Sequence, residues 1–142
     1  MAKIYRTTDR ICVKIEDVTL KFSPLTLDQK SEIQQELLSS MKEVDIAKAS
    51  RGIMLALKYG LKHIEGVEDS DGKPYQLTFD NLGHLAEECI HDLLNLDISN
   101  KLALVSSSFV KGVPKVFTNR DGKPIDGVEV LNQAKDTAGK NA

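Results

Sequence analysis

The sequence lacks the residues on which small secreted proteins and zinc modules depend. It has no tryptophan and only two cysteines in 142 residues. Cys12 and Cys89 lie far apart, with no Cys-x-x-Cys spacing. Disulfide scaffolds and structural zinc sites need paired or closely spaced cysteines. The sequence therefore predicts neither, and both thiols, which are flanked by apolar residues, are expected to be free and buried.

Long apolar runs and a strong charge of either sign are also missing. No apolar stretch approaches the roughly 20 residues of a membrane-spanning helix, and the first six residues do not form the apolar segment of a signal peptide. We therefore expect a protein that stays in a reducing cytoplasm and has no membrane partner. Nineteen Lys and Arg face 21 Asp and Glu, a formal net charge of −2. Phosphate contacts supply most of the affinity of nucleic-acid binders, so nucleic acid is not an expected partner.

What the chain does have is the composition of one ordinary globular domain. Hydrophobic residues make up 41% and charged residues 28% of it, which suits a folded protein with a single core. Residues 11–22 predict a β-hairpin, because apolar residues alternate with others on both sides of a turn at Glu16-Asp17. A lone hairpin is marginal in water, so helices are expected to cover its apolar face.

Helical periodicity dominates the residues that follow. Thr26 and Gln29 have the spacing of a capping box, and apolar stripes predict helices over about 26–41, 44–62, 81–95 and 97–112. Gly52 either weakens the second helix or lets another helix approach closely. The predicted fold is mainly α with a short N-terminal β-hairpin (an α+β chain), with about four helices in two pairs. A small hairpin or loop containing the turn motif Asp71, Gly72 and Pro74 is expected between the pairs.

The last thirty residues differ from the rest of the chain. We place a boundary between a hairpin-plus-helical domain, 1–112, and a C-terminal segment, 113–142, that is weakly ordered or docks on a partner. Its apolar residues include four candidate partner-binding positions: Phe117, Val128, Val130 and Leu131. These side chains could instead dock on the chain's own domain, and the sequence favours that alternative without deciding it.

Each candidate catalytic or metal site fails on spacing or ligand type. His84, Glu88 and His91 could share a face of the third predicted helix, but they do not match a zinc-protease motif. Around Gly72, an EF-hand register would put Val67 and Thr78 at ligand positions that need carboxylates. The run Ser106–Ser108 has no nucleophile-elbow motif around it, and no phosphate-binding glycine loop occurs. The sequence therefore predicts a non-enzymatic protein without metal or cofactor.

Two segments of the chain resemble a known family. They are similar to tail assembly chaperones of long-tailed bacteriophages. The first is 59–82, with its Gly66-Val67 and Asp71-Gly72-Lys73-Pro74 steps and its Asn81-Leu82 pair. The second is 22–27, with its Leu25-Thr26 step. The resemblance covers about residues 11–110, and Ile64 stands where relatives often have tryptophan. It implies a protein of the host cytoplasm that binds the tape measure protein and keeps it soluble until tail tube protein polymerises around it.

A second hypothesis is a structural tail or neck connector that stays in the virion. Such a subunit could polymerise through an exposed edge of the hairpin over residues 11–22. The sequence leaves open homo-oligomerisation, the partner-binding surface and a longer frameshifted form.

Overall fold

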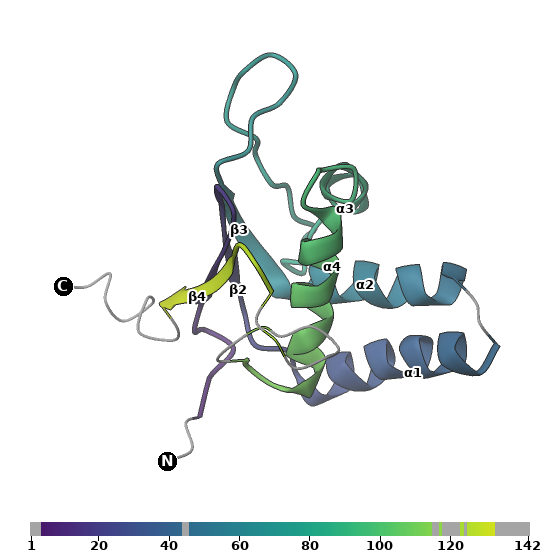
Figure 1. Ribbon diagram of the computed structural model, residues 1–142. Coiled ribbons are helices and arrows are strands. Elements are labelled where there is room, and N and C mark those ends of the chain that lie inside the picture. The colour runs from purple at the N-terminus through teal and green to yellow at the C-terminus, as the bar shows by residue number, and fades with distance from the viewer. Residues whose placement is uncertain (1–3, 44–45, 115–116, 118–122, 124, 133–142) are drawn as a thin grey trace.

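The structure is a computed structural model that describes residues 4–43, 46–114, 117, 123 and 125–132, with side chains left out at 39–43, 46–49 and 132. It consists of two layers, a four-stranded antiparallel sheet and a layer of helices on one of its faces (Figure 1). Within the described residues, no helix is both long and apolar enough to cross a bilayer.

The N-terminal hairpin is confirmed and forms the centre of the sheet. Strands β1 (Ile11–Ile15) and β2 (Val18–Phe22) pair with Ile11 opposite Phe22 and Ile15 opposite Val18. The tight turn between them places Glu16 at a φ of 54°. The apolar residues of both strands point to the same face, as the period-2 alternation predicts, and this face packs against the helices.

The prediction that the strands are limited to this hairpin is wrong. Strand β3 (Leu61–Glu65) pairs with β2, and strand β4 (Val128–Asn132) pairs with β1, so the sheet has the order β3-β2-β1-β4. The periodicity predicts that residues 61 and 62 end the second helix, but in the structure they begin β3. The chain leaves the helix at Gly60, whose carbonyl accepts a hydrogen bond from the backbone N–H of Ser23 at 2.8 Å. The fold is therefore α+β with a full antiparallel sheet.

The first two helices form an antiparallel pair that extends away from the sheet (Figure 1). Helix α1 (Leu27–Glu43) begins after the predicted capping box: the backbone N–H of Gln29 donates to Thr26 Oγ1 at 3.2 Å, and that of Thr26 donates to Gln29 Oε1 at 3.0 Å. Helix α2 (Ile46–Gly60) approaches α1 closely at Gly52, where an added Cβ would lie 2.8 Å from Leu37. Of the two interpretations of Gly52, close approach fits the structure.

The third helix is shorter than predicted. Helix α3 (Glu87–Leu93) starts six residues after the expected Asn81, because Gly83 has a φ of 79° and ends a tight turn. Asp80 Oδ1 accepts the backbone N–H groups of Leu82 and His84 at 2.8 and 3.0 Å. Leu82, expected on the buried stripe of the helix, is therefore 75% exposed at the tip of this turn.

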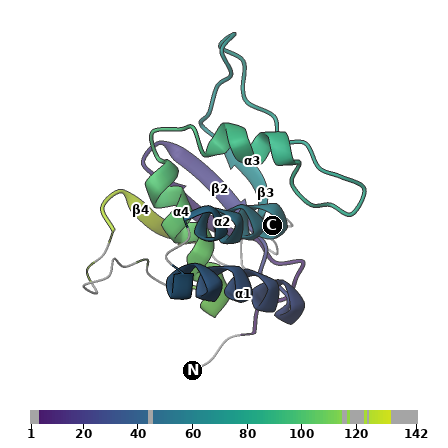
Figure 2. The same cartoon turned by 90° about the vertical axis from the view of Figure 1, so that its right-hand side faces the viewer.

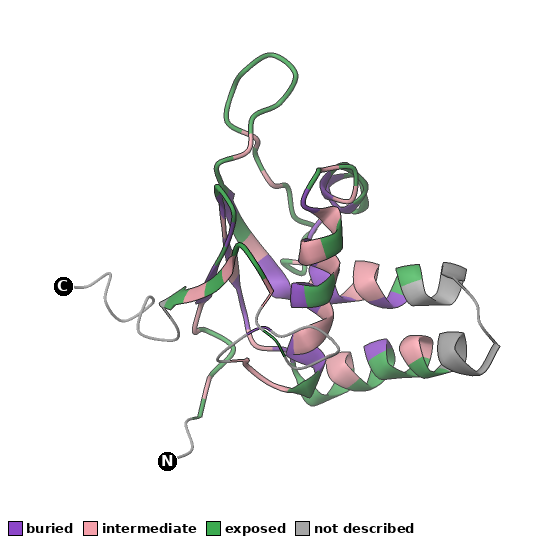
Figure 3. Cartoon of the chain, in the orientation of Figure 1, coloured by how far each residue is buried: buried purple, intermediate pink, exposed green. Residues whose placement is uncertain are grey.

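The turn motif Asp71, Gly72 and Pro74 lies at the tip of the long exposed loop at the top of Figure 3. Asp69 Oδ1 accepts the backbone N–H groups of Asp71 and Lys73, and Gly72 has a φ of 80°. Pro74 forms an isolated bridge with Glu68. The loop is a reversing turn, as predicted.

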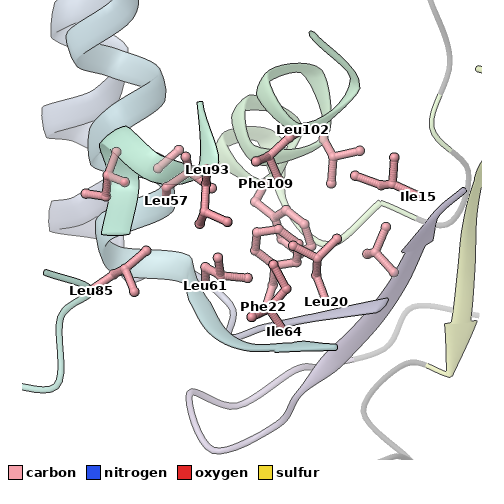
Figure 4. Packing of buried hydrophobic residues seen from close by; sticks show 14 of the residues in the cluster. Ile15, Leu20, Phe22, Leu57, Leu61, Ile64, Leu85, Leu93, Leu102 and Phe109 are labelled. Atoms are coloured by element: carbon pink, nitrogen blue, oxygen red, sulfur yellow. The ribbon is translucent and has the colours of Figure 1, made fainter. Parts of the chain in front are cut away.

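The core lies between the sheet and the remaining helices, α4 (Ser99–Ser108) and the 3-10 turn η1 (Phe109–Lys111), which ends at Gly112. Phe22 of β2 stacks on Phe109 of η1 with ring centroids 4.9 Å apart (Figure 4). Leu102 of α4 and Leu57 of α2 are also fully buried. The same core therefore joins the hairpin to all the helices after it.

Candidate protein-binding groove

The residues considered as chemical sites do not come together. His84 lies in the turn before α3 and contacts the ring of Tyr59 edge-on, so the His84-Glu88-His91 row on one helix face does not form. His63 pairs with Glu65, both exposed, at 2.9 Å. No group of three or more His, Cys, Asp or Glu in the described part of the chain could hold a metal ion.

The serine run is bound within its own helix. The hydroxyls of Ser107 and Ser108 donate to the carbonyls of Leu104 and Val105, three residues earlier. Ser106 is buried, and its hydroxyl has no hydrogen-bond partner among the described residues. The bonds that the run does form therefore go to the backbone of α4, not to a histidine or a carboxylate that could activate a nucleophile.

Three of the four candidate partner-binding residues of the C-terminal segment contact the chain itself. Phe117 is 3% exposed and packs against Phe109, with ring centroids 6.3 Å apart. Val128 and Val130 of β4 lie opposite Ile15 and Val13 and pack against the core. Leu131, at an irregularity in the strand pairing, is 48% exposed. The self-docking alternative therefore describes Phe117, Val128 and Val130, and Leu131 is the only one of the four exposed to a partner.

Residues of α1, α2, α3 and the turn before α3 line a hollow on the helical side of the protein. Figure 2 shows how these three helices lie relative to one another. We call this hollow the α1–α2–α3 groove. It encloses about 650 Å³ and consists entirely of described residues. Its floor is apolar and made of Met54, Leu55, Leu85, Ala86 and Ile90. Its charged lining is Glu32, Glu36, Arg51, Lys58, Asp80 and Glu87.

The floor of this groove is absent from the sites predicted from the sequence, although α2 contains a signal for it. The run Ile53–Leu57 is apolar without a break, so α2 carries apolar residues beyond the stripe that faces the core. Leu57 is fully buried, whereas Met54 and Leu55 are only half-buried. A helix that is apolar on more than one side needs a second apolar neighbour.

Hydrogen bonds hold the walls of the groove in place. The hydroxyl of Tyr59 donates to Glu32 at 2.7 Å, which links α1 to α2. Burial, and then the hydrogen bond to Glu32, raises the pKa of Tyr59 to about 12. On the opposite side, the backbone N–H of Leu85 donates to the carbonyl of Lys58, which fixes the segment before α3 against α2.

A further network anchors the loop that leads into α3. The hydroxyl of Tyr75 donates to Asp92 at 2.7 Å, and burial followed by this bond raises the pKa of Tyr75 well above its ordinary value. The backbone N–H and hydroxyl of Thr78 lie 3.4 and 3.3 Å from Cys89 Sγ. Both cysteines are free and buried, as predicted. The position of α3 beside α2 is thus fixed from both ends of the loop.

A second hollow of about 690 Å³ lies between α1, α4 and η1. Leu38 and Leu104 form its exposed apolar rim, and Lys111 is its one charged lining residue among those described. It is bordered by Phe117 and Ile125, and residues 115–116, 118–122 and 124 around them lie outside the described residues. The lining of the α1–α2–α3 groove, in contrast, is not interrupted by such gaps in the sequence.

Comparison with family models, with curated proteins and with solved structures finds no match to this chain.

Proposed function

We propose that this protein is a non-enzymatic binding protein of the host cytoplasm that acts as a tail assembly chaperone of a long-tailed bacteriophage. Its partners are the tape measure protein and, during tube assembly, the tail tube protein. The observation that supports protein binding is the α1–α2–α3 groove, an open surface with an apolar floor and charged sides. Such a surface suits an amphipathic helix, whose apolar face lies in the groove while its flanks stay polar.

The phage assignment is supported by the resemblance of the segment from Tyr59 to Leu82. In the structure this segment contains β3, the exposed Asp71-Gly72 turn and the first three residues of the Asp80–Gly83 turn that precedes α3. The carboxylates of Asp69 and Asp80 accept backbone N–H groups in its two turns, so the sequence of these turns is constrained by backbone geometry.

The test is to follow the chain through infection. We expect an affinity-tagged copy to co-purify with the tape measure protein from infected cells before lysis, and its peptides to be absent from purified virions by mass spectrometry. Abundant peptides in mature particles would contradict the chaperone and favour the connector. Co-purification with no tail protein at either stage would reject both.

The connector hypothesis has lost its structural support at the hairpin. Strands β1 and β2 are the two central strands, and each pairs with a neighbour on both sides. Their backbone groups are therefore not available to another subunit unless the sheet opens. Only β3 and β4 remain as edges of the described sheet.

A further inference from the structure

The floor of the α1–α2–α3 groove has the chemistry of a helix-binding surface, since it is apolar and lies between charged side chains. Met54 and Leu55 lie on adjacent positions of α2, and Ile90 lies on α3 beside them. An α-helix with side chains is about 10–12 Å wide and presents an apolar ridge through residues spaced three and four apart. Such a ridge would cover the half-buried residues of the floor, Met54, Leu55 and Ala86.

The charges around the floor are unbalanced. Four carboxylates, of Glu32, Glu36, Asp80 and Glu87, face two cations. Arg51 Nε lies 3.6 Å from Glu36 Oε2 and neutralises that side chain in part. Backbone N–H groups, first that of His84, hold the pKa of Asp80 below its usual value, so Asp80 carries its charge at neutral pH.

The carboxylates lie on both sides of the floor. Glu32 and Glu36 come from α1, whereas Asp80 and Glu87 come from the turn before α3 and its first residue. Glu87 has no hydrogen bond or ion pair with any described residue. A ligand with cations on both flanks of an apolar ridge would meet opposite charge on both sides.

We propose that the α1–α2–α3 groove binds an amphipathic helix of a partner protein, with an apolar ridge of Leu, Ile or Met flanked by Lys and Arg. The apolar floor supplies most of the affinity, and the acidic sides select cationic flanks and orient the helix. The inference rests on the proposed function only in that both require a helical protein partner.

The test uses an 18-residue fluorescein-labelled peptide with Leu at positions spaced three and four apart and Lys or Arg beside them. A matched peptide carries Glu in place of every Lys and Arg. Binding to the full chain is measured by fluorescence anisotropy in 50 and 500 mM NaCl. We expect the cationic peptide to bind at least about 10-fold more tightly than the acidic one at low salt, with a smaller ratio at high salt because ions screen exposed charges.

Two substitutions in the groove and two matched controls locate the binding site. Glu87→Lys is expected to weaken binding of the cationic peptide about 5-fold, and Met54→Ala about 10-fold. Glu88→Lys makes the same charge change on the next residue of α3, which does not line the groove, and Leu104→Ala truncates an exposed leucine on α4. Both controls should bind within about 2-fold of the wild type. Far-UV circular dichroism and Tm establish that each variant is folded. If Met54→Ala does not fold, Glu87→Lys alone tests whether the peptide binds in the groove.

Several results would overturn the proposal. Equal losses in Glu87→Lys and Glu88→Lys would mean that the peptide follows net charge alone. If only Leu104→Ala weakened peptide binding, the peptide would bind in the hollow beside α4. If the protein formed a concentration-dependent dimer that Met54→Ala dissociates, the groove would bind a second copy of the chain. Peptide binding in the groove without co-purification of tape measure protein would leave this inference standing and reject the phage function. If the tape measure protein co-purified equally well with the groove variants, the phage function would stand and this inference would be rejected.

Discussion

Gly66 provides a direct test of how the sheet is assembled. It follows β3 and has a φ of 89°, a left-handed conformation that L side chains rarely adopt. A Cβ at this position would also collide with the backbone carbonyl oxygen of Asp17 in the β1–β2 turn. Backbone cannot rotate away as a side chain does, so either β3 or the turn must move.

The magnitude follows from two contributions. The left-handed conformation costs an alanine about 1–2 kcal/mol, and overpacking against backbone adds about 1–3 kcal/mol. We therefore expect Gly66→Ala to lower the free energy of unfolding by about 3 kcal/mol, which for a chain of this length lowers Tm by roughly 10 °C. Urea denaturation followed by circular dichroism gives the free energy, and a thermal scan gives Tm.

Gly83→Ala is the matched control. Gly83 has nearly the same φ, 79°, but no atom of the surrounding chain lies within 4 Å of its added Cβ. It therefore carries the conformational cost alone, about 1–2 kcal/mol. If the two variants lose the same stability, Gly66 does not approach Asp17 and the described pairing of β3 with β2 is incorrect at this end.

Three further predictions concern the C-terminal segment, the wall of the groove and the start of α1. Phe117→Ala should lower the free energy of unfolding by about 3–5 kcal/mol because it empties a core position. Leu131→Ala should change the free energy of unfolding by less than about 1 kcal/mol. Equal effects of the two substitutions in urea denaturation would contradict the self-docked position of Phe117. The absorbance at 295 nm of the wild type minus that of Tyr59→Phe should titrate near pH 12. Because the folded pKa is raised above the ordinary 10.0, the stabilising bond to Glu32 is fully present below pH 10 and is lost as the pH rises toward 12; a midpoint at 10 would show that this bond is not formed. Thr26→Ala should cost about 1 kcal/mol of stability and Thr26→Ser almost none, measured by the same denaturation, since serine preserves the cap; an equal loss in both would exclude capping as the cause.

Local patterns predicted the elements whose signals are contained within a few residues. The hairpin over 11–22 alternates cleanly on both strands, and the capping box joins two residues three apart. The failures involve partners distant in sequence. Leu61 and Ile64 continue a helical spacing from α2, and only their pairing with β2, about forty residues earlier, makes them a strand. Five residues are too few for periodicity to separate the two alternatives.

The C-terminal strand illustrates the same limit. Val128 and Val130 are apolar, and the alternation of a strand is present in them. Their partner is β1, near the opposite end of the chain, and no local signal specifies a pairing over that separation. The short α3 is a different case. Gly83 stands within an otherwise convincing leucine pattern, and the turn anchored by Asp80 overrides that pattern because a glycine at positive φ ends a helix.

The two hypotheses about phage assembly now depend on different surfaces of the molecule. Helix α2, which carries the groove residues Met54 and Leu55, lies on the opposite side of the fold from the edge strand β4 in Figure 1. A connector that polymerises by strand addition would use β4, whose outer edge has no strand partner in the described sheet and carries the exposed Leu131. A chaperone that holds a helix would use the floor at Met54. Leu131→Lys should therefore impair a connector and leave a chaperone unaffected, because a charged residue on a sheet edge blocks strand addition while the groove stays intact. Met54→Ala should have the opposite effect, so the pair of variants separates the hypotheses in one phage complementation assay, even while the partner is unidentified.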